Sequence, residues 1–306
     1  MKSQFLAAAF AAVVLAAPAK DIVITIYPAY DWTRTVVGTH TNEFNLTLLQ
    51  KSGADLHSFK PTAKDVAKVA GCDLFIHVGG ESDEWVGPLL QQSPKQTRQV
   101  LNFLAALGSA VRNEEVVEGM QAEEEEKGED EGEEEKDEHV WLSLRLAARL
   151  VNEIAARLAL LDPANAADYK ANAKAYVAKL TALDARYADM ARNAKRKTLL
   201  FADRFPFRYL IEDYGLKYHA AFVGCSAETE ASFKTVVFLA RKVDELNLPC
   251  VLTLEGSGRK IAETVVRTSK AKSARIGTVD SLQSLGGNGY LDAMTRNLAV
   301  FTDALN

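Results

Sequence analysis

The sequence predicts an α/β fold of two lobes with parallel sheets, joined by one long rigid linking helix. Short apolar runs of the kind that form buried strands recur along the chain. Helical patterns separate these runs, and this alternation is typical of parallel sheets covered by helices. One much longer helical pattern occupies residues 162–194, and a chain of 306 residues leaves room for a lobe on either side of it.

Residues 1–19 are expected to be a secretory signal peptide. A basic start at Lys2 precedes an apolar run from Phe5 to Ala17, and Ala17-Pro18-Ala19 matches an A-x-A cleavage site. The run is shorter than the roughly 20 apolar residues of a spanning helix, which argues against a membrane anchor. The mature chain is therefore expected outside the cytoplasm.

Both lobes contain predicted strands and helices. The predicted strands of the N-terminal lobe, residues 20–161, cover 21–26 and 74–78, and those of the C-terminal lobe, residues 195–306, cover 198–201 and 250–254. The predicted helices cover 62–70, 142–161, 233–246 and 260–268. Ligands of such sheets bind beyond the carboxyl ends of the strands, so the loops there are the expected place for a site.

The pattern at residues 162–194 predicts a single linking helix. Asp162 is a suitable N-cap, and Pro163 is a suitable first helical residue. Apolar positions then recur at alternating spacings of four and three residues, at Tyr169, Ala173, Tyr176, Leu180, Leu183, Tyr187 and Met190. A helix of about 30 residues spans on the order of 45 Å, so it can join two lobes as a stiff connection.

Charge is distributed unevenly. Residues 114–138 contain 15 Asp and Glu against two Lys, a balance of −13, so the other residues sum to +8 because the whole chain carries −5. This acidic segment is expected to be a disordered, solvated loop, which either only solubilises the chain or weakly collects cations. No compact basic stripe interleaved with aromatic residues occurs elsewhere, which argues against nucleic acid as a partner.

The three cysteines, Cys72, Cys225 and Cys250, are an odd number in an oxidising compartment. They permit at most one internal disulfide and leave a thiol. A disulfide framework is therefore excluded, while pairing among the three stays open.

Two of the five histidines stand where α/β lobes present ligand groups. His57 lies on an expected strand-to-helix loop, and His139 follows the acidic segment and opens a helical pattern. His77 lies inside a predicted strand and is expected to be a core or edge residue, whereas His40 and His219 lack supporting context. A single histidine is more often structural than a ligand, but the shared placement of His57 and His139 indicates a metal site.

The stretches GADLHSFKPTAKDV and DEHVWLS, with the acidic segment between them, resemble motifs of the zinc/manganese ABC transporter substrate-binding protein family. There the motifs are approximately G-A-D-P-H-S-(F/Y)-x-P-T and (D/E)-x-H-x-W-(L/M)-(D/S). The likeness covers nearly the whole mature chain, because the long helix, FRYLIEDYGLKYHAAFVGCSAETEAS and the C-terminal lobe follow in family order. The resemblance implies a metal site in the cleft between the lobes, with His57 and His139 as the two histidine ligands of the N-terminal lobe.

The C-terminal lobe departs from the family pattern F-H-D-A-(F/Y)-G-Y. Ala202 stands where the third histidine, or the glutamate of manganese binders, is usual, and Asp203 beside it is the local substitute. The stretch RIGTVDSL resembles the family strand that ends in an aspartate ligand, which maps to Asp280. Glu255 is a further candidate and Cys225 a weaker one. The expected metal ligands are His57, His139, Asp280 and Asp203.

Two imidazoles with one or two carboxylates suit four-coordinate zinc. Manganese accepts the same set although it prefers more oxygen ligands, so Mn²⁺ is the alternative metal. A charged loop before the second histidine favours zinc, since zinc members of the family commonly carry one, although usually with more histidines than here.

The resemblance implies an extracytoplasmic solute-binding protein, expected to be a monomer, that captures Zn²⁺ and delivers it to an ABC transporter permease in the membrane. No cysteine stands near the end of the signal, which departs from lipoprotein members and favours a free periplasmic form. A secreted zinc enzyme is the competing class, but the sequence contains no H-E-x-x-H, no G-x-S-x-G elbow and no phosphate-binding glycine loop. An adhesion or scaffolding protein would leave the contexts of the two histidines unexplained, so a receptor without enzymatic activity is expected.

Overall fold

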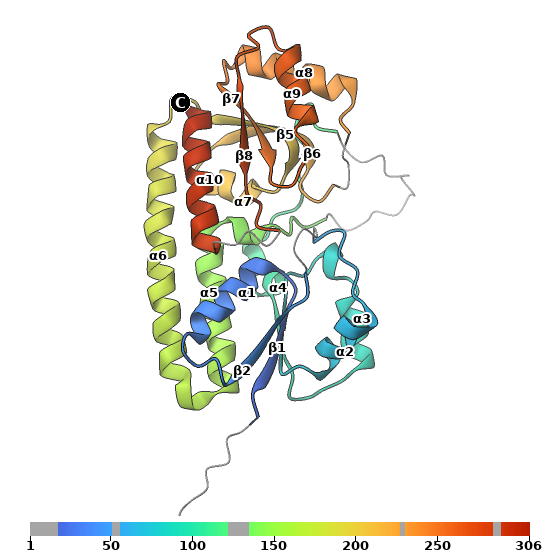
Figure 1. The fold of residues 1–306 in the computed structure, drawn as a ribbon, viewed down its shortest axis with the longest axis vertical. Coiled ribbons are helices and arrows are strands. Elements are labelled where there is room, and N and C mark those ends of the chain that lie inside the picture. The colour runs from blue at the N-terminus through green and yellow to red at the C-terminus, as the bar shows by residue number, and fades with distance from the viewer. Residues whose placement is uncertain (1–17, 51–55, 122–134, 227–229, 284–288) are drawn as a thin grey trace, which may run out of the picture.

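The computed structural model describes residues 18–50, 56–121, 135–226, 230–283 and 289–306. Nearly all of the expected signal peptide and the centre of the acidic segment, residues 122–134, lie outside the described residues. Within them, the chain forms two lobes, each built around a parallel four-stranded sheet (Figure 1). The predicted fold class is therefore confirmed.

The N-terminal lobe is built on a sheet whose central strands are β1 and β3. In spatial order the strands are β2 (Phe44–Leu48), β1 (Lys20–Ile24), β3 (Leu74–His77) and β4 (Gln99–Asn102). The helices of this lobe are α1 (Tyr27–Val37), α2 (Ala63–Gly71), α3 (Val86–Gln92), α4 (Phe103–Leu107) and α5 (Leu144–Leu161). Ile22 of β1 pairs with Leu46 on one side and Leu74 on the other, so apolar residues of three strands stand in register within the core.

The C-terminal lobe repeats this arrangement. Its strands, in spatial order, are β6 (Lys217–Val223), β5 (Thr198–Phe205), β7 (Cys250–Leu254) and β8 (Arg275–Val279). Its helices are α7 (Arg208–Asp213), α8 (Phe233–Glu245), α9 (Lys260–Thr268) and α10 (Tyr290–Leu305). Phe201 pairs with Ala220 of β6 and Leu252 of β7, which places its ring in the centre of the second lobe.

The linking helix is α6 (Ala166–Asn193), which lies beside α5 of the first lobe and α10 of the second (Figure 1). All seven apolar positions named from the sequence are buried. Asp162 and Pro163 are the N-cap and first residue of a 3₁₀ helix, Pro163–Asn165, that runs directly into α6, whose own N-cap is Asn165. The Asp162 side chain makes no capping hydrogen bond. The Asp162 carboxylate instead accepts hydrogen bonds from the Asn165 amide and the Tyr169 hydroxyl.

Buried hydrogen bonds tie the two lobes together along α10. The Tyr187 hydroxyl donates to the Met294 carbonyl at 2.7 Å, and the Tyr290 hydroxyl donates to the Trp141 carbonyl at 2.6 Å. The Trp141 indole in turn donates to the Ser281 carbonyl at 2.9 Å. The first bond joins the linking helix to α10, and the other two hold the C-terminal lobe against Trp141, just before α5. None of the described helices is both long and apolar enough to cross a membrane.

The two ends of the acidic segment, residues 114–138, differ from the solvated loop predicted from the sequence. It was expected to be solvated throughout, but Asn113 and Lys136 form an antiparallel bridge, and Gln121 bridges to Phe222 of β6. Asp137 and Glu138, at its end, are buried. Burial of these two carboxylates is possible because each accepts a hydrogen bond from a backbone N–H, Asp137 from His139 and Glu138 from Ser82.

Candidate metal centre

His57 and His139 both lie in segments that lead into helices. His57 is in a turn between β2 and α2, and the Phe59 amide closes this turn on the Leu56 carbonyl at 3.1 Å. His139 is the N-cap of a short 3₁₀ helix, Val140–Leu142, which leads into α5. These placements match the loop-to-helix positions expected from the sequence.

The fold brings the two imidazoles together with their rings tilted at 54° to each other and their Nε2 atoms adjacent. Their Nε2 atoms lie 3.2 Å apart, and their ring centroids are separated by 5.1 Å. Two nitrogens bound at 2.0–2.1 Å to one tetrahedral zinc ion are about 3.3 Å apart. The two Nε2 atoms are thus already at the spacing that a shared zinc ion requires.

Asp137 orients the His139 ring. Its Oδ1 accepts from the His139 backbone N–H at 2.9 Å and lies 3.0 Å from Nδ1 of the same residue. A carboxylate on one ring nitrogen directs the other nitrogen toward a metal and raises its basicity. Burial acts to lower the pKa of His139, but the hydrogen bond and charge of Asp137, with Glu138 and Glu114, outweigh it and raise that pKa.

Ser82 and Glu138 hold His57 in a similar way. The Ser82 hydroxyl lies 2.9 Å from Nδ1 of His57, and Oε2 of Glu138 lies 3.6 Å from the same nitrogen. The other oxygen of Glu138 accepts from the Ser82 backbone N–H at 2.9 Å, and burial raises the pKa of Glu138 to about 7. In both histidines, Nδ1 is held by the protein and Nε2 faces the other ring.

Gly80 allows this arrangement. Its backbone φ angle is 80°, a value that residues with a side chain rarely adopt. A Cβ atom at this position would also lie only 2.3 Å from Oε1 of Glu138. A larger residue would therefore displace the carboxylate that supports His57.

Cys225 joins the two histidines from the C-terminal lobe. One ligand atom from each of His57, His139 and Cys225 lies within 4.8 Å of the others, and no other such group of metal-ligating side chains occurs in the described ranges. The Cys225 backbone N–H donates to Oε1 of Glu114 at 3.1 Å. Burial and the nearby carboxylates, Glu114 first among them, raise the pKa of the Cys225 thiol.

Gln283 also reaches this group from the C-terminal lobe, and sequence reasoning missed it. Its Nε2 lies 3.1 Å from Nε2 of His139, and its Oε1 accepts from the Leu56 backbone N–H at 3.2 Å. A lone glutamine after a strand carries no sequence signal of its own. Only the return of the segment after β8 to the N-terminal lobe places it beside His139.

Asp203 lies outside this group, and its carboxylate is used within the C-terminal lobe. Oδ2 accepts from the Thr253 hydroxyl at 2.7 Å and the Leu254 backbone N–H at 2.9 Å. Oδ1 accepts from the Arg204 backbone N–H at 2.9 Å and lies 3.2 Å from the Ser257 hydroxyl. The structure therefore gives Asp203 the role of joining β5 to the end of β7.

Asp280 and Glu255 also lie outside the group, and both shape the segment that leads to Gln283. Oδ1 of Asp280 accepts from the Leu282 backbone N–H at 2.9 Å, and Oδ2 accepts from Arg296 at 3.3 Å. The two oxygens of Glu255 accept from the backbone N–H and the hydroxyl of Ser281, at 2.6 and 2.7 Å. Both residues are thus placed to support the site indirectly.

The remaining histidines and cysteines have separate surroundings. His77 is a core residue of β3, as expected, with Nδ1 3.2 Å from Oδ2 of Asp83. His40 bonds to Asp168 at 2.8 Å. All three cysteines are free, and Cys72 and Cys250 are buried away from the histidine pair.

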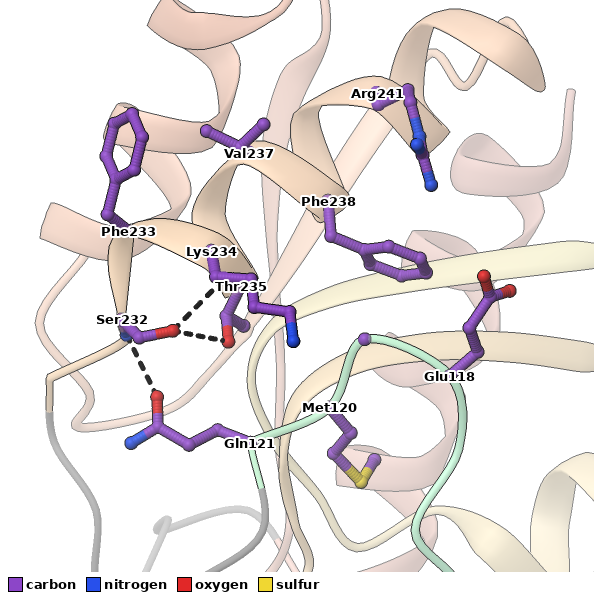
Figure 2. Close-up of a pocket in the computed structure, with 11 residues that line it drawn as sticks. Glu118, Met120, Gln121, Ser232, Phe233, Lys234, Thr235, Val237, Phe238 and Arg241 are labelled. Carbon is purple, nitrogen blue, oxygen red and sulfur yellow. Dashed lines mark hydrogen bonds between the residues drawn. The ribbon is translucent and has the colours of Figure 1, made fainter.

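A cavity of about 1000 Å³ lies elsewhere on the C-terminal lobe, between α8 and residues 118–121. Figure 2 shows Phe238 and Glu118 on its walls, and Gln121 hydrogen-bonded to Ser232 at the start of α8. No histidine or cysteine lines it, so its size does not make it the place for metal chemistry.

Comparison of the sequence with known proteins identifies the family of this chain. The sequence model described as "Zinc-uptake complex component A periplasmic" matches residues 22–304. The chain is 32% identical over 289 residues to the high-affinity zinc uptake system protein ZnuA of Bacillus subtilis, covering 93% of this chain and 87% of that protein.

Two further similarities involve AdcA of Streptococcus pneumoniae. The chain is 31% identical over 283 residues to the zinc-binding lipoprotein AdcA of serotype 4, covering 91% of this chain but 54% of AdcA, so it spans about half of that relative. The solved structure of the Zn(II)-bound ZnuA-like domain of AdcA superposes with a TM-score of 0.73 and 28% identity, covering 94% of this chain and 99% of that domain.

Proposed function

The chain belongs to the family of periplasmic zinc-uptake components, and from that membership we propose that it is an extracytoplasmic receptor that binds Zn²⁺ between its lobes and delivers it to an ABC-type importer. The metal is the cargo of this receptor. The permease of the importer is the membrane partner in this proposal.

The observation that carries the proposal is the approach of the His57 and His139 Nε2 atoms to 3.2 Å. Both Nδ1 atoms are held by protein groups, so each ring presents its Nε2 to the same point. Neutral imidazoles fixed in this way are good ligands for zinc. The N-terminal lobe therefore supplies a preformed pair of ligands.

The donor set favours zinc over the alternative, manganese. Two imidazoles present nitrogen to the centre, and the described residues of the C-terminal lobe bring a thiol and an amide to them. The two carboxylates expected there, Asp203 and Asp280, are occupied by hydrogen bonds inside the C-terminal lobe. Manganese prefers oxygen-rich sites, whereas nitrogen and sulfur donors suit zinc.

The proposed role is binding and release, not catalysis. A zinc hydrolase needs an open coordination position with a general base aimed at the bound water. Here the buried carboxylates next to the histidines, Asp137 and Glu138, lie on the Nδ1 side of the rings, away from the shared Nε2 point.

Isothermal titration of the zinc-free mature chain with Zn²⁺ and Mn²⁺ tests the proposal, with ester and peptide hydrolysis assayed on the same sample. One tight Zn²⁺ site, at least tenfold weaker binding of Mn²⁺ and no hydrolysis are expected. Failure to bind Zn²⁺ tightly would refute the receptor function, and zinc-dependent turnover would replace it with an enzyme.

A further inference from the structure

We propose that the Cys225 sulfur is a protein ligand of the bound metal, supplied by the C-terminal lobe where the chain lacks a third imidazole. This inference rests on the proposed zinc-binding function and specifies the site further. It makes the centre a His₂Cys site, in which the sulfur binds as thiolate and its proton leaves to the buffer.

The position of Cys225 fits such a site. Its sulfur and a ring nitrogen of each of His57 and His139 lie within 4.8 Å of one another. A tetrahedral zinc ion with Zn–S of 2.3 Å and Zn–N of 2.0–2.1 Å holds sulfur and nitrogen about 3.6 Å apart. A contraction of roughly 1 Å therefore brings the three atoms to coordination geometry.

The backbone around Cys225 is held against the histidine pair. The Cys225 backbone N–H donates a hydrogen bond to the half-buried Glu114 side chain. The Ser226 backbone N–H donates to the Val223 carbonyl and so closes a turn after β6. Gly224 lets this turn pass close to His139, because a Cβ there would lie 3.0 Å from Cε1 and 3.1 Å from Nδ1 of that ring. The close approach is therefore built into the fold of this segment.

Within the described part of the C-terminal lobe, the other donors that the sequence suggested are engaged in hydrogen bonds or lack a ligand atom. Ala202, at the position of the usual third ligand, is buried in β5 and carries no donor. Asp203, Glu255 and Asp280 accept hydrogen bonds within their own lobe. The fourth coordination position of the metal is then available to the Gln283 side-chain amide, which contacts His139, or to a water molecule.

A thiolate ligand changes which metals the receptor retains. Sulfur is a soft donor that suits zinc and disfavours manganese. A His₂Cys centre would therefore discriminate against Mn²⁺ more strongly than the two histidines with carboxylates expected from the sequence.

The first test uses the unaltered mature chain. With Co²⁺ as the probe, a thiolate ligand produces an intense sulfur-to-metal charge-transfer band in the near ultraviolet, which nitrogen and oxygen ligands do not. X-ray absorption of the Zn²⁺ form should show one sulfur at about 2.3 Å. Tight binding of Co²⁺ and Zn²⁺ with neither signature would overturn the role of Cys225 and leave the receptor function standing. Absence of any binding would overturn both.

The second test compares Cys225→Ser with Cys250→Ala, a matched control whose thiol is buried in β7. Cys225→Ser should lose the charge-transfer band, bind Zn²⁺ at least tenfold more weakly and narrow the ratio of Zn²⁺ to Mn²⁺ affinity. Cys250→Ala should keep all three properties of the parent. A band that survives Cys225→Ser, or Zn²⁺ affinity unchanged by it, would refute the proposal.

Discussion

The Nε2 atoms of His57 and His139 lie 3.2 Å apart although 82 positions separate the two residues in the chain. Each ring is held through its Nδ1, by Ser82 in one case and Asp137 in the other. The positions of the two rings therefore depend on contacts within the protein and not on a bound ligand.

Replacing either histidine should weaken zinc binding. We expect His57→Ala and His139→Ala each to lower Zn²⁺ affinity at least tenfold, about 1.4 kcal/mol, because each removes one of two facing nitrogen donors. Isothermal titration with a competing chelator measures the change.

His40→Ala is the matched control for this pair. His40 bonds to Asp168 on the surface of α6 and takes no part in the metal-ligating group. The His40→Ala variant should bind Zn²⁺ with the same affinity as the parent protein. Parental affinity in either His57→Ala or His139→Ala would refute the assignment of the site.

Asp137→Ala should weaken Zn²⁺ binding about 10- to 100-fold although Asp137 is not proposed as a ligand. The carboxylate fixes the tautomer and the orientation of the His139 ring through Nδ1. Circular dichroism of the variant should remain that of the parent. Affinity within about threefold of the parent would show that the ring needs no support from Asp137.

Zinc affinity should fall as pH decreases, because a protonated imidazole cannot coordinate a metal. Burial alone would lower the pKa of His139, but Asp137 and the other carboxylates outweigh burial and raise it above its ordinary value of 6.5. The loss should therefore begin above pH 6.5 as pH is lowered. Chelator competition between pH 8 and 5.5 measures it, and a flat profile would contradict histidine ligation.

Asp203→Ala should reduce the stability of the fold and leave the metal site nearly intact. The carboxylate accepts from Thr253, Leu254, Ser257 and the Arg204 backbone, so its removal should cost about 2–3 kcal/mol of unfolding free energy. Urea denaturation of the zinc-free protein measures this cost.

Asp303→Ala is the control for that variant, because this exposed carboxylate lies 3.9 Å from Arg275 and should contribute less than about 0.5 kcal/mol. A tenfold loss of Zn²⁺ affinity in folded Asp203→Ala would return Asp203 to the ligand set.

Replacing residues 122–134 with an uncharged Gly-Ser linker of equal length should remove weak, salt-sensitive binding of divalent cations. The replaced stretch contains nine acidic residues and one lysine. Attraction to such a charge run is electrostatic and screened by salt. The bridged ends of the acidic segment are kept, so the tight site and the unfolding temperature should not change. Loss of the tight site would show that this stretch supplies a ligand.

The central strands of both lobes could be predicted from the sequence, whereas three of the four edge strands could not. The four apolar runs found first correspond to β1, β3, β5 and β7, which occupy the middle of their sheets. Such strands are buried on both faces and therefore carry uninterrupted apolar residues. The edge strands β2, β4 and β6 are partly exposed and lack that pattern, and β8 was recognised only by its resemblance to a family strand.

The sequence by itself determined the lobes, the linking helix and the two histidines, because these depend on local periodicity and on motifs of adjacent residues. Only the tertiary structure decided which side chains of the C-terminal lobe lie beside these histidines. Asp203 and Asp280 follow strands as ligands should, yet their oxygens accept hydrogen bonds inside their own lobe. Cys225 and Gln283 reach the histidines instead, because the path of two loops across the lobe junction sets which donor arrives, and that path depends on packing between residues far apart in the chain.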